Sequence, residues 1–207
     1  MEFWPEILTK ASWEKLISLK KEFKFILIGG WAAYLHTEMH KSKDIDIVVD
    51  YSVLKYLKKN YNLVKNDRLK KYEIKLEKFD IDIYVAYFSE LSIPLEDIDN
   101  QTLVINGITA VKAEPLLILK QGAEINRRSS IKGNKDSIDI VTLLLHSEIN
   151  YDAYFKLLKK YKKENFRDEL VSVIKNFSDK SIDYLDINFN EFKKWRKKII
   201  EKLKNLK

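Results

Sequence analysis

The sequence predicts an α+β protein, in which a small mixed β-sheet core with flanking helices is followed by a helical C-terminal half. Short β-branched runs alternate with amphipathic stretches up to Val111, whereas every periodic segment from Pro115 onward has helical spacing. The chain has 207 residues, of which 45% are hydrophobic, and this is enough to bury a core. We therefore expect two parts, an α/β core over residues 1–114 and a basic helical region over residues 115–207.

The predicted strands are short, apolar and mostly β-branched. They are Phe25–Ile28, Asp44–Val49, Tyr72–Leu76, Phe79–Phe88 and a hairpin over Gln101–Val111, whose turn is Asn106-Gly107. The predicted helices have apolar residues at three- and four-residue spacing. They are Pro5–Lys20, Trp31–Leu35, Ser52–Lys59, Leu116–Ile125, Ser137–Leu145, Ala153–Lys160, Arg167–Ile174 and Glu191–Leu206.

The positive charge of the chain is confined to its last part. Residues 1–150 hold 22 basic and 22 acidic residues, whereas residues 151–207 hold 16 basic and 9 acidic residues. This excess accounts for the whole net charge of +7 and favours a polyanionic partner for the C-terminal region. A solvated, lysine-rich helical face explains it equally well.

Several function classes are disfavoured by composition. The sequence contains no cysteine, which excludes disulfides, thiolate metal sites and cysteine nucleophiles. The first residues are acidic and lack the basic and apolar regions of a signal peptide, and no apolar run approaches the ~20 residues needed to span a bilayer. We expect a cytoplasmic protein with no membrane partner.

A glycine pair ends the first predicted strand. Gly29 and Gly30 follow Phe25–Ile28 and precede a helix. Such a turn presents backbone N–H groups at a positive helix end, and the missing β-carbons allow a ligand to approach closely. The turn therefore suits a phosphate, although many strand-to-helix turns use glycine for packing alone.

Two aspartates stand on one face of the second predicted strand. Asp44 and Asp46 alternate with core-like residues, so their like charges lie close together. A packed core does not favour this arrangement, whereas a divalent cation between the carboxylates does, and Mg²⁺ prefers carboxylates together with phosphates and waters. The alternative is an exposed edge strand whose two aspartates face solvent and have no function.

A later strand, Phe79–Phe88, repeats the pattern with Asp80 and Asp82. A third carboxylate beside the first two would complete a two-metal site for phosphoryl or nucleotidyl transfer, or act as general base on an acceptor hydroxyl. Asp82 lies deeper in the strand and is the preferred residue. Asp80 shares its face, so the choice between them stays open.

Taken together, these residues resemble the polymerase-β-like nucleotidyltransferase superfamily. The resemblance covers residues 25–145 and depends on Gly29-Gly30, thirteen intervening residues, Asp44-Ile-Asp46 and Asp82. It implies an enzyme that transfers a nucleoside monophosphate from an NTP with two Mg²⁺ ions. The glycines would hold the triphosphate, Asp44 and Asp46 would bind both metals, and Asp82 would bind the catalytic metal and polarise the acceptor.

Later motifs resemble the stand-alone AbiEii-type nucleotidyltransferases. They are Pro115-Leu-Leu-Ile-Leu-Lys120, Arg127-Arg128 and Lys135-Asp-Ser-Ile-Asp139-Ile140. The resemblance implies that Lys120 contacts nucleotide phosphates and that Asp139 supports the site. A lysine that extends to solvent and an aspartate paired with Lys135 or Arg128 are the plain alternatives.

The start of the core also resembles small-molecule adenylyltransferases, but His40-Lys41-Ser42-Lys43 replaces their arginine and histidine before the aspartate pair. Lys43 is a further candidate phosphate contact.

The preferred acceptor is an RNA such as tRNA, bound by the basic C-terminal helix. A toxin with an antitoxin partner is one use of such an enzyme. The alternatives are ATP-dependent adenylylation of a small molecule or protein, and a silent nucleotide- or RNA-binding module.

Overall fold

The computed structural model describes residues 3–205, and it confirms the predicted α+β class with a helical C-terminal half. The chain forms two compact units, the first ending at Lys112 and the second beginning at Ala113. The predicted boundary between residues 114 and 115 falls inside the first helix of the second unit. Among the described helices, none is long and apolar enough to cross a membrane.

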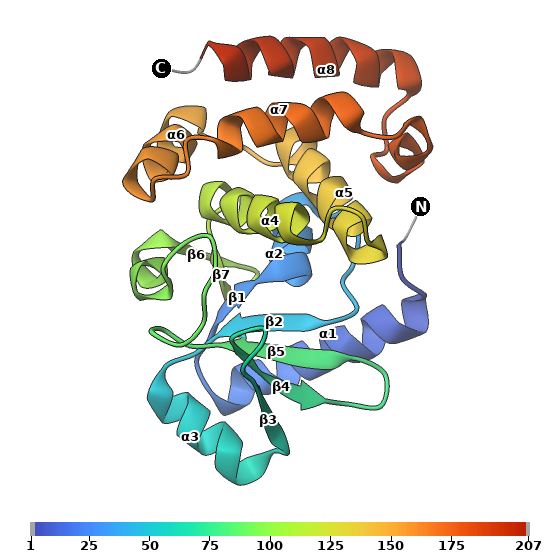
Figure 1. The fold of residues 1–207 in the computed structure, drawn as a ribbon. Helices are drawn as coiled ribbons and strands as arrows, with labels where there is room; N and C mark the ends of the chain where they lie inside the picture. The colour runs from blue at the N-terminus through green and yellow to red at the C-terminus, as the bar shows by residue number, and fades with distance from the viewer. Residues whose placement is uncertain (1–2, 206–207) are drawn as a thin grey trace. The chain divides into compact units, whose positions relative to one another are not determined.

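The N-terminal unit is built on one seven-stranded mixed sheet with the order β3-β4-β5-β2-β1-β7-β6 (Figure 1). β1 pairs antiparallel with β2 and parallel with β7, and β2 pairs parallel with β5. The strands are β1 (Ile26–Ile28), β2 (Ile45–Val48), β3 (Leu63–Asn66), β4 (Lys71–Lys75), β5 (Asp80–Tyr84), β6 (Thr102–Ile105) and β7 (Ile108–Val111).

On the central strands β2 and β5, buried isoleucines alternate with partly exposed aspartates, and β2 ends on the buried Val48. Ile45, Ile47, Ile81 and Ile83 are fully buried, while the aspartates between them point to the opposite face and stay partly exposed. This alternation follows from the two-residue period of a strand. It places all four predicted acidic side chains on one face of the sheet.

Four helical segments complete the N-terminal unit. They are α1 (Glu6–Glu22), α2 (Gly29–Thr37), α3 (Tyr51–Asn60) and the 3-10 helix η1 (Leu95–Gln101). The indole N–H of Trp31 in α2 donates to the Ser12 hydroxyl of α1 at 2.8 Å inside the core. This bond fixes the start of α2 against α1, directly behind the glycine turn.

Between Ala113 and Asn205, the C-terminal unit is built from helices joined by short turns. They are α4 (Ala113–Arg127), α5 (Ile131–His146), α6 (Tyr151–Lys160), α7 (Phe166–Asn176), η2 (Asp179–Tyr184) and α8 (Phe189–Lys204). The turn that joins α4 to α5 is tight. It requires glycine at position 133, because a β-carbon on Gly133 would lie 2.1 Å from the Arg127 carbonyl oxygen. The two helices therefore form a close hairpin.

The structure corrects several details of the sequence-based prediction. Strand β3 and both 3-10 helices were not predicted. Helix α5 begins at Ile131, six residues before the predicted start, because Ser130 caps it by accepting from the Gly133 N–H. Asp50, by contrast, caps α3 as the sequence predicts, since its side chain accepts from the Val53 N–H. The predicted helix end at Leu206 lies outside the described residues.

Candidate active site

The turn from β1 to α2 needs glycine at both positions. Gly29 has φ +69°, and a β-carbon there would lie 2.1 Å from Oδ2 of Asp46. A β-carbon on Gly30 would lie 2.5 Å from the Ser42 hydroxyl. The first predicted motif therefore packs directly against the second. No side chain caps the N-terminus of α2, whose first-turn N–H groups suit an anion.

The three predicted carboxylates lie on neighbouring strands of the sheet. Asp46 and Asp82 are register partners on the parallel strands β2 and β5, and Asp46 is also paired with Ile28, beside the glycine turn. Asp44 precedes β2, and its Oδ1 accepts from the Asp80 backbone N–H at 3.2 Å. The glycine turn and the acidic strands thus meet at one end of β1, β2 and β5.

Asp80 and Asp82 occupy different environments. Asp80 contributes its backbone N–H to the contact with Asp44. Asp82 is the deeper residue, with a side chain only 14% exposed. Burial, followed by repulsion from Asp46, raises the pKa of Asp82 to about 7, although Lys71 opposes the rise. Asp82 is therefore the aspartate of β5 that interacts with the Asp46 charge.

Two functional candidates, Lys71 and Glu73, were missed by sequence reasoning. The Lys71 ammonium lies 2.6 Å from Asp82 Oδ2 and 3.0 Å from Glu73 Oε1. Burial alone would lower the pKa of Lys71, but Asp82 and Glu73 outweigh it and raise the pKa. The lysine is held as a cation beside the acidic row. Its position two residues before Glu73 on one strand face was the available signal.

The flanking residues Ser42, Lys43 and Tyr84 surround this end of the sheet. The Tyr84 hydroxyl donates to Asp46 Oδ1 at 3.5 Å. The Ser42 hydroxyl donates to the Asp44 carbonyl oxygen at 3.0 Å, which holds it against Gly30. The Lys43 ammonium lies 5.9 Å from the ring centroid of Trp4. Lys43 lies in the loop that leads to the aspartate pair.

The oxygen donors at this site fit Mg²⁺ in type. Within residues 3–205, no group of three or more His, Asp or Glu side chains is arranged to hold a metal ion unaided. The fold instead brings together a carboxylate pair, Asp46 and Asp82, with Asp44 two residues before Asp46 in the chain. Mg²⁺ is commonly held by one or two carboxylates, with waters and substrate phosphates as the remaining ligands.

Lys120 and Asp139 lie in the C-terminal unit, where they contact each other. The Lys120 ammonium is 2.7 Å from Asp139 Oδ2 and 3.4 Å from Asp136 Oδ1, and Lys135 bonds the other oxygen of Asp139. Burial alone would raise the pKa of Asp139, but Lys120 and Lys135 outweigh it and hold the pKa below its usual value. These residues form a buried ion cluster between α4 and α5.

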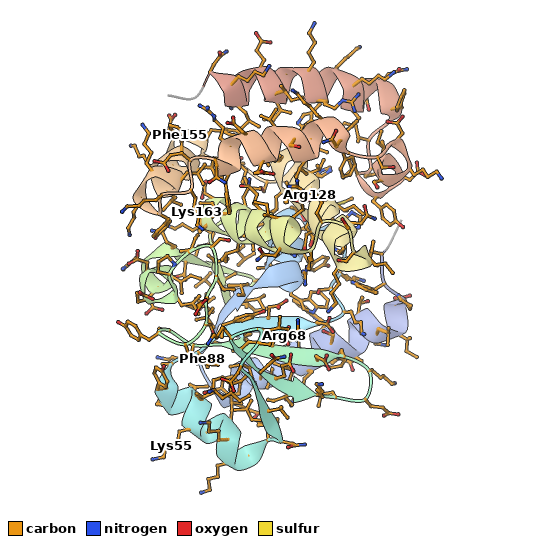
Figure 2. All side chains as sticks on the ribbon, in the orientation of Figure 1. Lys55, Arg68, Phe88, Arg128, Phe155 and Lys163 are labelled. Atoms are coloured by element: carbon orange, nitrogen blue, oxygen red, sulfur yellow. The ribbon has the colours of Figure 1, made fainter. Side chains whose placement is uncertain are left out.

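Basic side chains of the C-terminal unit lie over aromatic rings. The Lys159 ammonium is 4.8 Å from the ring centroid of Phe155 on α6, and that of Lys163, in the turn between α6 and α7, is 5.5 Å from that of Phe166 (Figure 2 labels Phe155 and Lys163). The Lys193 ammonium lies 4.1 Å from the ring centroid of Phe189, and that of Lys202 lies 4.0 Å from the ring centroid of Tyr151. On α8, Phe192, Ile199 and Leu203 are buried, whereas Trp195 is half-exposed. The lysines face solvent.

Comparison with known proteins yields likeness in structure but not in sequence. No family model and no curated protein matches the chain. A Helicobacter pylori protein described as a candidate nucleotidyltransferase matches with a TM-score of 0.51 and 18% identity, over 99% of both chains. The chain therefore shares the fold of that protein.

Two further structures are similar to the chain at lower scores. JHP933 from Helicobacter pylori matches with a TM-score of 0.48 and 18% identity, over 94% of this chain and 91% of its own. An antigenic nucleotidyltransferase-like protein from Paracoccidioides brasiliensis matches with a TM-score of 0.38 and 18% identity, over 79% and 90%.

Proposed function

We propose that the chain is a Mg²⁺-dependent nucleotidyltransferase, which moves a nucleoside monophosphate from an NTP to an acceptor hydroxyl. One observation carries the proposal. A β-carbon on Gly29 would lie 2.1 Å from Oδ2 of Asp46, and Asp46 is the register partner of Asp82, so a glycine turn and two acidic strands converge at one place. The shared fold with a protein described as a candidate nucleotidyltransferase is consistent with it.

Each residue then has a chemical role. Gly29 and Gly30 hold the triphosphate through backbone N–H groups, and Asp44 and Asp46 hold Mg²⁺, which supplies charge to the phosphates when bound. The acceptor oxygen forms a bond to the α-phosphorus, and the bond between that phosphorus and the bridging oxygen of the β-phosphate breaks. Pyrophosphate leaves with the electron pair.

Asp82 takes the proton of the acceptor hydroxyl in this scheme. A general base works best when its pKa lies near the operating pH, and Asp82 has a pKa of about 7. Burial and the neighbouring Asp46 together produce this value. Lys43 contacts a phosphate of the incoming nucleotide in the proposal. The nucleotide contacts of Lys120 and Asp139 stay predictions.

The proposed acceptor is an RNA such as tRNA. The whole charge excess of the chain lies in its C-terminal region, and the lysines of α8 are exposed next to aromatic rings. Phosphate backbones are bound by lysine and arginine, and unstacked bases by aromatic side chains. A toxin controlled by an antitoxin protein, and adenylylation of a small molecule or protein with ATP, are the other outcomes to be tested.

Pyrophosphate release tests the reaction class. We expect release from at least one NTP when Mg²⁺ and total RNA are present, and its loss in Asp46→Asn. Asp99→Asn is the matched control, because Asp99 is an exposed aspartate of the same unit. Equal rates in Asp46→Asn and wild type would contradict the proposal. A wild-type protein that binds NTP without releasing pyrophosphate would favour the silent binding module.

A further inference from the structure

Lys71 makes the closest ion pair at the acidic row. Its ammonium lies 2.6 Å from Asp82 Oδ2, and the two side chains are 12% and 14% exposed. The same ammonium is 3.0 Å from Glu73 Oε1, to which the Asn66 amide donates at 3.1 Å. The Glu73 carboxylate, which Asn66 of β3 holds in place, thus binds the Lys71 ammonium on one side, and Asp82 binds it on the other.

The sheet register explains this position. Glu73 is the partner of Asp82 on the antiparallel strands β4 and β5, and Asp82 is in turn the partner of Asp46 on β2. Three carboxylates therefore form one row across three strands. Lys71 shares a strand face with Glu73, because the two are two residues apart. The Lys71 ammonium therefore lies beside the row of carboxylates formed by Glu73, Asp82 and Asp46.

The two ions of a two-metal site stand about 3.5–4 Å apart, and the family resemblance places one of them at Asp82. At Asp82 the oxygen Oδ2 already contacts an ammonium at hydrogen-bonding distance. A lysine and a divalent ion cannot occupy the same position, and their like charges repel strongly in a partly buried site. The place of a second ion beside Asp82 is thus taken by the lysine.

We propose that Lys71 replaces one of the two divalent ions, so that the site holds a single Mg²⁺ at Asp44 and Asp46 while Lys71 positions Asp82. This inference rests on the proposed function. It departs from the two ions that the family resemblance implies. Lys71 contacts Oδ2 of Asp82, and the other oxygen, Oδ1, takes the acceptor proton. Lys71 is a positioning residue, because it acts through Asp82.

The number of bound ions tests the proposal, with Mn²⁺ alone as the probe and electron paramagnetic resonance of free Mn²⁺ as the readout. The full-length wild type is expected to bind one Mn²⁺ at the site. Lys71→Met removes the charge and keeps the length, so it is expected to bind two. Lys71→Arg keeps a cation and is expected to bind one. Lys75→Met is the matched control, since Lys75 is an exposed lysine of the same strand.

The outcomes separate this inference from the proposed function. Two ions in the wild type, or one ion in a folded Lys71→Met variant, would overturn the role of Lys71 and leave the proposed function intact. If Lys71→Met does not fold, the wild-type and Lys71→Arg counts decide alone, and two ions in either contradict the proposal. Asp46→Asn is expected to bind no Mn²⁺ at the site. The same result in the wild type would contradict the metal-dependent function itself and this inference with it.

A second readout follows the Mg²⁺ dependence of pyrophosphate release. The wild-type rate is expected to show no dependence on Mg²⁺ beyond the ion carried by the NTP, because that ion is the one held by Asp44 and Asp46. The Lys71→Met rate is expected to rise further with Mg²⁺ concentration as a second ion binds. A merely structural role of Lys71 would lower the rate and leave this dependence unchanged.

Discussion

At the scale of single residues, the contact between Gly29 and Asp46 joins two motifs that are separate in the sequence. The presence of a glycine turn and an aspartate pair was predictable from residue type and strand period. Their contact was not, because it depends on the register of β1 against β2, in which Ile28 lies opposite Asp46. The ion pair of Lys71 with Asp82 was not predictable either, because it requires the pairing of β4 with β5.

Gly29→Ala should lose both stability and activity. An alanine at φ +69° costs about 1–2 kcal/mol in backbone strain, and its β-carbon would displace the Asp46 carboxylate. Gly107→Ala is the control, since Gly107 has φ +73° but its β-carbon would meet only the flexible end of Lys20. Denaturant unfolding should show both losses of stability, whereas pyrophosphate release should fall in Gly29→Ala alone. Retained activity in Gly29→Ala would disprove the close contact.

Asp82→Asn should lower the rate of transfer far more than Asp80→Asn. A general base contributes about 10²–10⁴-fold. Asp80 acts on Asp44 through its backbone N–H, which asparagine keeps. Steady-state rates of the two variants at saturating NTP provide the measurement. An equal loss in both, or a larger loss in Asp80→Asn, would reverse the assignment of the third carboxylate.

At the scale of elements, long periodic segments were predictable and short polar ones were not. The hairpin of β6 and β7 formed at Asn106-Gly107 as predicted, with φ +50° and +73°. Strand β3 was missed because it is an edge strand whose middle residues, Val64 and Lys65, are exposed, so it lacks the alternation of a half-buried strand. Helix α5 begins six residues before its predicted start, because its mostly polar first turn lacks an apolar period and is stabilised by the Ser130 cap.

Asp139→Asn should destabilise the pair of helices α4 and α5. Breaking a buried ion pair costs about 3–5 kcal/mol, because Lys120 and Lys135 would keep buried charges without their carboxylate. The lowered pKa of Asp139 makes this contribution pH-dependent. It is complete above the unfolded value of 3.8 and is lost as the pH falls through the lower folded pKa.

Denaturant unfolding from pH 7 down to acid checks this prediction. The difference between wild type and Asp139→Asn should be constant at neutral pH and shrink below the unfolded pKa. Asp168→Asn is the control, because its side chain is 79% exposed and such pairs contribute under about 1 kcal/mol. A difference that grew toward low pH would contradict the direction of the shift.

At the scale of the whole molecule, the distribution of charge along the chain follows from the sequence, whereas the division into compact units comes from the structure. The chain divides between Lys112 and Ala113, and all of the net charge of +7 belongs to the second unit. Composition was sufficient for this because charge adds along the chain, whatever the fold. The location of single contacts needs the tertiary structure, which is why candidate site residues could be named individually from the sequence and their neighbours could not.

The acceptor proposal predicts that charge on α8 controls RNA binding. Replacing Lys194, Lys197 and Lys198 with alanine should weaken binding and reduce the salt slope by about 2, since each phosphate contact on a single strand contributes about 0.7. The control removes Lys55, Lys58 and Lys59 from α3, which are equally exposed and belong to the neutral unit. Filter binding of total tRNA at several salt concentrations provides the test. Equal effects of the two triple variants would argue against an RNA surface on α8.

Label transfer from NTP tests the central claim most directly. Each NTP is supplied with the label either on the α-phosphate or on the γ-phosphate, together with Mg²⁺ and total RNA. Nucleotidyl transfer predicts that the α-label moves to the acceptor and the γ-label leaves as pyrophosphate, in wild type and Asp99→Asn but not in Asp46→Asn. An acceptor that carries the γ-label, or α-label transfer that persists in Asp46→Asn, would contradict the assignment of this site to nucleotidyl transfer.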